Sequence, residues 1–319
     1  MLVPSPKPIV AKPIVVVGSI NADLVATVEH IPLTGETITG NSFQTHPGGK
    51  GANQAVAVAR LGYPVKMIGK LGNDANGDLL RSHLQKSGVD TTAIQTTAGS
   101  SGTALILVSS AGENCIVVIP GANALVTAAD IDANIATIRE AGMVLAQLEI
   151  PIETVLHLAE VCSREGIPLI LDPAPAVTLP RKLLENVAWF TPNETEAAFF
   201  IHNLTPSAHA NSPSEIATAL KTAALHNIIL KLGSRGAFLS SDTTEVQVAS
   251  FPVKAIDSTA AGDTFNGAFA TGLMLGKTET GSASFAAAAA AISVTRAGAQ
   301  PSMPSLEEVN ALLEKARQH

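Results

Sequence analysis

The sequence has few of the residues that build disulfide frameworks, metal clusters or aromatic surfaces. Its only two cysteines, Cys115 and Cys162, lie far apart and outside any Cys-x-x-Cys spacing, so neither a disulfide framework nor a zinc site is expected. The eight histidines are scattered, and no two of them have the helical spacing of metal ligands. Aromatic residues make up only 3% of the chain, which leaves few partners for stacking a nucleoside base.

Positive charge is also scarce. The 20 lysines and arginines are outnumbered by 27 aspartates and glutamates, which gives a formal net charge of −7. No basic stripe is present that could neutralise phosphates, so neither nucleic acid nor an acidic membrane surface is expected as a partner. A small soluble ligand agrees better with this composition.

The chain lacks a hydrophobic run long enough for a membrane span or a signal peptide. Its longest apolar stretch, residues 285–292, is mostly alanine and far too short to span a bilayer. Residues 1–13 contain four prolines and two lysines but no apolar core of a signal peptide. We therefore expect a disordered leader at residues 1–13, no membrane association and a cytoplasmic location.

Short apolar segments typical of buried strands alternate with segments of helical spacing. The expected strands are residues 14–17, 65–68, 143–146, 169–171 and 228–230. The expected helices are residues 52–61, 77–86, 152–164 and 215–225, followed by 262–275, 284–295 and 306–317. This alternation predicts an α/β fold with a mostly parallel central sheet between two layers of helices, in one domain over residues 14–319.

Two segments, residues 24–45 and 103–119, interrupt this alternation. Both carry strand-forming residues and glycine-containing turns, with no helical pattern between consecutive strands. Hairpins inserted near the carboxyl ends of the main strands could form a small sheet over a ligand crevice. We therefore expect a β lid built from about residues 24–47 and 103–120. The alternative is two decorative hairpins at a sheet edge.

The strongest local motif is AAGDTF at residues 260–265, where a turn of small residues opens a helix. Small residues let the backbone approach a ligand closely, and free N–H groups at a helix start bind anions. Asp263 would then lie where a phosphoryl group and an attacking hydroxyl meet. It is a candidate general base beside an anion hole formed by Ala260, Ala261 and Gly262. The alternative is an acid that merely complements the helix dipole.

A second glycine turn, GGKGAN at residues 48–53, also runs directly into a helix. Its three glycines, Gly48, Gly49 and Gly51, are costly unless the backbone needs unusual torsions or close contact with a ligand. Lys50 and Asn53 supply polar donors at that point. Because Lys50 is followed by glycine rather than Ser or Thr, this is not a Walker A loop, and no dinucleotide-binding Gly-x-Gly-x-x-Gly follows a strand.

Polar side chains follow two of the expected strands. Asn21 and Asp23 come after the first strand, and Glu149 comes after the segment 143–148. Ligands of open α/β sheets bind at such strand ends, and a mixture of amides and carboxylates suits the hydroxyls of a sugar. Any one of these residues alone would be interpreted as a solvated turn residue. Together they favour a sugar site.

These motifs resemble the two signatures of the ribokinase-like (pfkB) carbohydrate kinase family, here residues 48–60 and 257–265. The resemblance runs from Val15 to about Ser305. It implies a three-layer α/β fold with a β lid, and ATP-dependent phosphorylation of a primary hydroxyl, the 5-hydroxyl of ribose being the expected acceptor. It also implies Mg²⁺ with the ATP, an activating K⁺, and a homodimer formed through the lid.

The family pattern also implies roles for individual positions. Those matching its sugar site are Asn21, Ala22, Asp23, Gly48, Gly49, Lys50, Gly51, Asn53, Glu149 and the base Asp263. Those matching its nucleotide site are Asn193, Glu196 (near Mg²⁺ through water), Lys231, Leu232, Gly233, Ser234, Arg235, Gly236, Ala261 and Gly262. Those matching its K⁺ site, which uses mostly main-chain oxygens, are Asp257, Thr259, Ser293, Arg296, Gly298 and Ser302.

Two positions depart from the family pattern: Lys231, where Thr or Ser is usual, and Ala287, where Asn or His often lies near the adenine. Both bear on nucleotide affinity rather than on activity. Within the family, the alternatives are kinases of fructose, 2-keto-3-deoxygluconate, deoxyribose or nucleosides, although Phe43 is the only aromatic residue of the lid segments. From another class, the alternative is a catalytically silent sugar or nucleotide sensor, which the presence of Asp263 and Gly262 disfavours.

Overall fold

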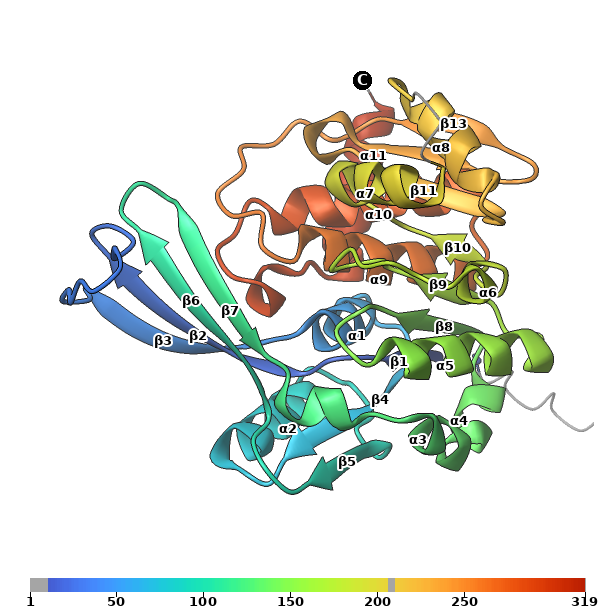
Figure 1. The fold of residues 1–319 in the computed structure, drawn as a ribbon. Helices are drawn as coiled ribbons and strands as arrows, with labels where there is room; N and C mark the ends of the chain where they lie inside the picture. The colour runs from blue at the N-terminus through green and yellow to red at the C-terminus, as the bar shows by residue number, and fades with distance from the viewer. Residues whose placement is uncertain (1–10, 206–209, 319) are drawn as a thin grey trace, which may run out of the picture.

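The structure is a computed structural model that describes residues 11–205 and 210–318 (Figure 1). Of the leader expected at residues 1–13, residues 1–10 lie outside the described residues, and 11–13 have no regular secondary structure. Within the described ranges, no helix is both long enough and apolar enough to cross a bilayer.

A nine-stranded sheet of the described residues forms the centre of the molecule. Its strands are β1 (Ile14–Val17), β4 (Val65–Gly72), β5 (Ile94–Thr97), β8 (Met143–Ala146), β9 (Leu169–Leu171), β10 (Trp189–Phe190), β11 (Asn227–Lys231), β12 (Ala237–Ser240) and β13 (Glu245–Val248). Their order is β13-β12-β11-β10-β9-β8-β1-β4-β5, and only β12 runs antiparallel to its neighbours. The predicted mostly parallel sheet is confirmed, while the antiparallel edge formed by β12 and β13 was not foreseen.

Helices cover both faces of this sheet (Figure 1). One face packs against α1 (Lys50–Arg60), α2 (Ala75–Lys86), α9 (Ala261–Met274), α10 (Glu279–Ser293) and α11 (Leu306–Arg317). The other packs against α3 (Ala128–Ala133), α4 (Ile135–Glu140), α5 (Ile152–Glu165), α6 (Arg181–Leu184), α7 (Glu194–Leu204) and α8 (Pro213–Lys221). Alternation along β1 explains this, because Ile14 and Val16 enter the first core and Val15 and Val17 the second. The three-layer α/β class is therefore confirmed.

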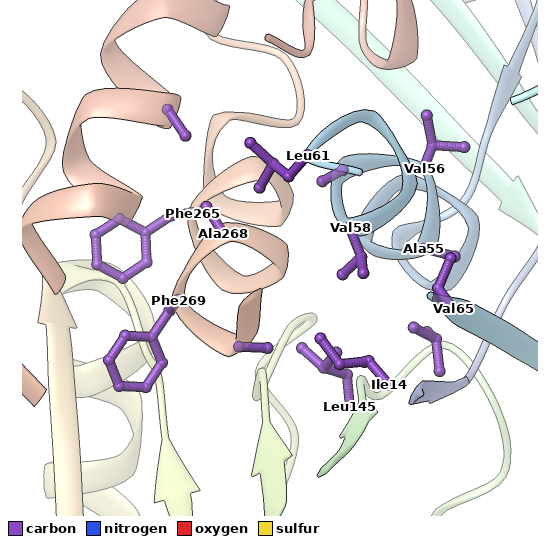
Figure 2. Close-up of a cluster of buried hydrophobic side chains, with 14 of the residues drawn as sticks. Ile14, Ala55, Val56, Val58, Leu61, Val65, Leu145, Phe265, Ala268 and Phe269 are labelled. Carbon is purple, nitrogen blue, oxygen red and sulfur yellow. The ribbon is translucent and has the colours of Figure 1, made fainter. Parts of the chain in front are cut away.

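Helices α1 and α9 lie side by side in the first layer, with Val58 of α1 and Ala268 of α9 above Ile14 of the sheet (Figure 2). A Cβ atom at Gly267 of α9 would lie 2.7 Å from the Cβ of Ala57 of α1, so glycine allows this close packing. The first turns of the two helices consequently meet, which brings together the two motifs of the sequence.

A separate four-stranded sheet projects from one end of the molecule (Figure 1). It consists of β2 (Asn21–Val28), β3 (Ser42–Gly48), β6 (Gly102–Ser109) and β7 (Asn114–Ile119), in the order β3-β2-β6-β7. The second sheet predicted from the two irregular segments is thus confirmed. Strand β2 begins at Asn21 rather than at residue 24, because Asn21 already pairs with Gly48 and Gly102. The candidate sugar residues therefore lie at the root of this sheet.

Candidate active site

Several of the predicted site residues lie at the carboxyl ends of β1, β8 and β11, next to Asp172 at the end of β9. The direction of sheet building reverses at β1, with β4 and β5 on one side and β8 to β11 on the other. Open α/β sheets bind ligands at such a switch point, because the loops diverge there and leave a crevice. Residues 18–23 follow β1, residues 147–149 follow β8, Asp172 follows β9 and Lys231 ends β11.

Asp263 lies in the first turn of α9, as predicted, and its side chain is buried. Its Oδ2 accepts a hydrogen bond from Nδ2 of Asn53 at 2.9 Å, and its Oδ1 accepts one from Nε2 of Gln54 at 3.1 Å. Burial raises the pKa of Asp263 to about 6, and Asp172 adds to the rise, whereas Lys50 and the two amides oppose it. A carboxylate with this pKa can accept a proton near neutral pH.

The start of α9 offers some of the backbone donors expected of an anion hole. Ala260 precedes the helix in a left-handed conformation, with φ of 57°, which turns the chain sharply into the helix. The N–H of Ala261 donates to the carbonyl of Ser258 at 3.2 Å, so this amide is held within the turn. The N–H groups of Gly262 and Asp263 belong to the first helical turn, whose amides have no partner inside the helix. Their partial positive charge favours an anion at this point.

The glycines before α1 allow its first turn to approach the end of β1. Gly49 has a φ of 86°, and a Cβ atom there would lie 2.7 Å from the backbone N of Asn21. A Cβ atom at Gly51 would lie 2.7 Å from the backbone N of Ser19. Unusual torsion and close backbone approach therefore both require glycine here.

Lys50 brings a positive charge among carboxylates. Burial works against this charge, but Asp263, Asp172, Glu149 and Glu196 outweigh burial and raise the pKa of Lys50. The backbone N–H of Lys50 also donates to Oε2 of Glu149 at 3.1 Å, which ties the start of α1 to the end of β8. The ammonium group is thus kept charged beside Asp263.

Asp23 lies with other carboxylates at the root of the second sheet. Burial raises the pKa of Asp23 to about 7, and the nearby charges of Glu149 and Asp263 add to the rise. Gly48 leaves space for this side chain, since a Cβ atom there would lie 2.1 Å from Oδ2 of Asp23. Ser19 donates its hydroxyl hydrogen to Oε2 of Glu149 at 2.5 Å. The carboxyl groups of Asp23 and Glu149 therefore lie close enough to influence one another and can accept hydrogen bonds from a ligand.

Asn21 is held by Asn123, a residue that no sequence pattern suggested. Nδ2 of Asn123 donates to Oδ1 of Asn21 at 2.7 Å, and Oδ1 of Asn123 accepts from the N–H of Ile20 at 2.9 Å. Asn123 comes from the segment between β7 and α3, so only the fold brings it to this point. Ala22 is a different case, because its side chain lies in the hydrophobic core and brings no polar group to the site.

An apolar pocket of about 360 Å³ opens beside the start of α9. The predicted nucleotide residues that line it are Lys231, Gly233, Ser234, Gly236, Ala261 and Gly262. The other lining residues are Ser250, Phe251, Pro252, Val253, Ala255, Ser258, Phe265, Ala287, Ala290, Ala291 and Val294. Three alanines of α10, Ala287, Ala290 and Ala291, form one wall of this pocket. A wall of small apolar side chains suits a flat ring system.

Among the described residues, the other predicted nucleotide residues do not line this pocket; they are Asn193, Glu196, Leu232 and Arg235. Leu232 is buried in the second core. Arg235 is exposed and forms an ion pair with Glu194. Asn193 and Glu196 cap α7, because the N–H of Glu196 donates to Oδ1 of Asn193 at 2.9 Å and the N–H of Asn193 donates to Oε2 of Glu196 at 2.8 Å. Glu196 nevertheless raises the pKa of Lys50, so its charge is felt at the site.

Comparison with known proteins agrees with this geometry. The pfkB family carbohydrate kinase profile matches residues 11–306. Ribokinase from Bacillus subtilis (strain 168) is 44% identical over 94% of this chain and 99% of its own. The crystal structure of ribokinase from Thermotoga maritima superposes with a TM-score of 0.88 at 39% identity, over 95% of this chain and 99% of its own. Arabidopsis thaliana ribokinase complexed with ribose and ATP gives a TM-score of 0.87 at 35% identity, with the same coverage.

The chain belongs to the pfkB family of carbohydrate kinases. The two positions at which this pfkB kinase departs from the family pattern, Lys231 and Ala287, both line the apolar pocket beside the start of α9. Lys231 is anchored there, because its Nζ donates to Oδ1 of Asp172 at 2.8 Å. Ala287 lengthens the apolar wall of α10 and offers no hydrogen bond from its side chain.

The positions of this pfkB kinase that match a K⁺ site lie in two adjacent segments, the turn before α9 and the stretch from the end of α10 to Ser302. The N–H of Ile256 donates to the carbonyl of Val294 at 2.7 Å, which joins the segments. The carboxylate of Asp257 accepts from the N–H groups of Thr259 and Gly298, at 2.9 and 2.8 Å. These bonds outweigh burial and lower the pKa of Asp257 below its usual value.

The other three positions have their side chains engaged elsewhere. Ser293 and Ser302 donate their hydroxyl hydrogens to the carbonyls of Ala290 and Ala299, at 2.9 and 2.7 Å. The guanidinium of Arg296 pairs with Glu308. The side chains of these three positions are therefore engaged within the protein.

Proposed function

We propose that the protein transfers the γ-phosphoryl group of ATP to the 5-hydroxyl of D-ribose, giving ribose 5-phosphate and ADP. The observation that carries this proposal is the position of Asp263, a buried carboxylate with a pKa of about 6 between a polar cluster and an apolar pocket. The similarity to Bacillus subtilis ribokinase, and to the solved Arabidopsis thaliana ribokinase complexed with ribose and ATP, supports this pair of substrates.

In this reaction Asp263 accepts the proton of the 5-hydroxyl while the oxygen attacks the γ-phosphorus, and the bond to the bridging oxygen of ADP breaks. Asn53 and Gln54 hold the carboxylate in place. The N–H of Gly262 and the ammonium group of Lys50 offset the charge that develops on the transferred group. These groups are fixed before the reaction, so little reorganisation is needed during it.

The sugar is held by the polar cluster at the root of the second sheet. Asn21, Asp23 and Glu149 present one amide and two carboxylates, which accept hydrogen bonds from several hydroxyls. Asn123 keeps the Asn21 amide in a fixed orientation. The second sheet rises from the same strand, β2, and would exclude water by closing over the bound sugar as a lid.

Two cations are expected with the substrates. Mg²⁺ would be held by the ATP phosphates and, through water, by Glu196, whose oxygens already face the start of α7. It would neutralise phosphate charge and orient the γ-phosphoryl group. K⁺ would be held by Asp257 and main-chain oxygens of the two adjacent segments, and it would stabilise the turn before α9 electrostatically.

The experiment that tests this function measures ADP formation by the purified protein with MgATP and a panel of ribose, deoxyribose, fructose, 2-keto-3-deoxygluconate and adenosine. We expect turnover to be highest with ribose and to fall when K⁺ is replaced by Na⁺. Preference for another sugar would keep the mechanism and overturn the substrate. Absence of turnover with every sugar would favour a silent sensor instead.

The second sheet also supports the proposal of a homodimer. Strand β7 is exposed along its whole length, and Leu105, Ile116, Val117 and Val118 expose between 44% and 54% of their surface. An exposed apolar sheet of this kind is usually covered by a partner, and a second copy would add a matching sheet. A monomer in sedimentation velocity at micromolar concentration would contradict this proposal.

The cytoplasmic location expected from the sequence stays a prediction.

The raised pKa of Asp23 predicts that this residue lowers the stability of the folded protein while it contributes to sugar binding. The unfolded chain releases the Asp23 proton near pH 4 and the folded chain near pH 7, so the folded protein loses stability as pH rises between these values. Asp23→Asn should therefore raise the unfolding temperature more at pH 8 than at pH 5, while raising the KM for ribose about tenfold or more. Thermal unfolding at the two pH values and ribose saturation curves check this. An equal shift at both pH values would contradict it.

A further inference from the structure

A chain of hydrogen bonds connects the nucleotide pocket with Asp263. Nζ of Lys231, which lines the pocket, donates to Oδ1 of Asp172 at 2.8 Å. The other oxygen of Asp172, Oδ2, accepts from Nε2 of Gln54 at 2.9 Å. The same Nε2 donates to Oδ1 of Asp263 at 3.1 Å. One amide group of α1 therefore bridges two carboxylates from different elements.

The orientation of this amide is fixed from its other side. Oε1 of Gln54 accepts a hydrogen bond from Nε2 of Gln147 at 2.7 Å. If the Gln54 amide were flipped, an oxygen would face two carboxylates and a nitrogen would face another nitrogen, and all three hydrogen bonds would be lost. Gln54 and Gln147 are both fully buried, so the lost bonds could not be replaced by water.

We propose that Gln54 and Asp172 are positioning residues for the phosphoryl transfer: Gln54 fixes the carboxylate of Asp263, and Asp172 fixes Gln54 and places a negative charge behind the base. This inference rests on the proposed function. Lys231 compensates the charge of Asp172 at the edge of the nucleotide pocket, so that this buried carboxylate is tolerated.

The charge of Asp172 has a direct consequence for the base. Three charged groups act on Asp263: Lys50 at the start of α1, Asp172 after β9 and Asp23 on β2. Lys231 of β11 is connected to Asp263 only indirectly, by its ion pair with Asp172. Asp172 raises the pKa of Asp263, whereas the hydrogen bond from Gln54 lowers it. Asp172 and Gln54 therefore shift the pKa of the same carboxyl group in opposite directions.

The test compares the pH dependence of kcat, at saturating ribose and MgATP, between the wild type and two variants. Asp172→Asn keeps an acceptor for Gln54 and removes the charge, so the acidic limb of the profile should move down by about one pH unit. Gln54→Met removes both donors at similar volume, so kcat should fall about 100-fold and the acidic limb should move up. A merely structural role would lower the unfolding temperature of both variants and leave the limb in place, which would overturn the inference.

Matched controls are available elsewhere in the chain. Lys70 and Asp130 form an ion pair of 2.7 Å with similarly small exposed fractions, so Asp130→Asn controls for the loss of such a pair. Gln85→Met repeats the glutamine change on α2, where Nε2 of the amide donates to Oγ1 of Thr91. Neither control should move the acidic limb.

Two outcomes separate this inference from the proposed function. If the wild type does not phosphorylate ribose, the proposed function fails first. If the wild type is active and the limb of Asp172→Asn stays where it is in Asp130→Asn, only the inference fails. Should Asp172→Asn not fold because Lys231 is left uncompensated, the double variant Asp172→Asn with Lys231→Met removes both charges, and its limb should move down in the same way.

Discussion

Asp263→Asn should lower kcat for ribose phosphorylation by about 10³-fold or more, because the amide cannot accept the proton of the attacking hydroxyl. The KM values for ribose and ATP should change far less, since the side chain keeps its size and the polar cluster and the pocket are formed by other residues. The unfolding temperature should change little, because removal of a buried charge offsets the loss of one of the two hydrogen bonds, from Asn53 or Gln54, that the amide nitrogen cannot accept. Steady-state kinetics together with thermal unfolding check the three expectations.

The control for this variant is Asp78→Asn. Asp78 is also an acid in the first turn of a helix, α2, but it is exposed. If Asp263 only complemented the dipole of its helix, the two substitutions would have the same small effect on stability and none on turnover. Full turnover of Asp263→Asn would refute its role as the base.

Gly262→Ala should fold normally and still lose most of its activity. Among the described residues, a Cβ atom at Gly262 would come within 4 Å only of Nζ of Lys231, at 3.5 Å, so no close contact there opposes the added methyl group. The methyl group would instead enter the space beside the anion hole and hinder the approach of the phosphoryl group. A phosphoryl group kept away from the N–H of Gly262 would forgo one donor of the hole, and losing one such donor typically costs about 100-fold in kcat.

Gly267→Ala on the same helix should instead lose stability. Its Cβ atom would lie 2.7 Å from Cβ of Ala57 and 2.9 Å from the carbonyl O of Gln54, so α1 and α9 would have to separate. We expect a loss of about 1–3 kcal/mol in the free energy of unfolding. Chemical denaturation and kcat, measured for both glycine variants, distinguish the two effects. Equal loss of stability in both would contradict a ligand role for Gly262.

The sequence predicted the parts of the fold and site that depend on local patterns. The strands around residues 14–17, 143–146 and 169–171 were found because buried parallel strands are short apolar runs. The first turns of α1 and α9 were found because glycine and alanine clusters before a helix are unusual. These two motifs meet in the structure, since Asn53 donates to Asp263.

The residues that sequence reasoning missed act through partners distant in the chain. Gln54 is separated from Asp263 by 209 positions and from Asp172 by 118, and a lone glutamine in a helix carries no pattern of its own. Asn123 and Gln147 are similar cases. On the pocket wall of α10, Ala287 had been placed near the nucleotide by the family pattern, but Ala290 and Ala291 were missed, because alanines in a helix have the composition of a packed helix and only the fold shows which of them face open space. Closure of the second sheet over a ligand stays a prediction.

The most direct test of the proposed function is the identity of the product. The purified protein would be incubated with MgATP, K⁺ and D-ribose labelled with ¹³C, and the products followed by ³¹P and ¹³C NMR. We predict one phosphorylated sugar, ribose 5-phosphate, formed in equal amount with ADP, and no phosphorylation of 5-deoxyribose. Phosphate on another oxygen of the sugar, or ADP formed without a phosphorylated sugar, would contradict the proposed role of Asp263 and of the site around it.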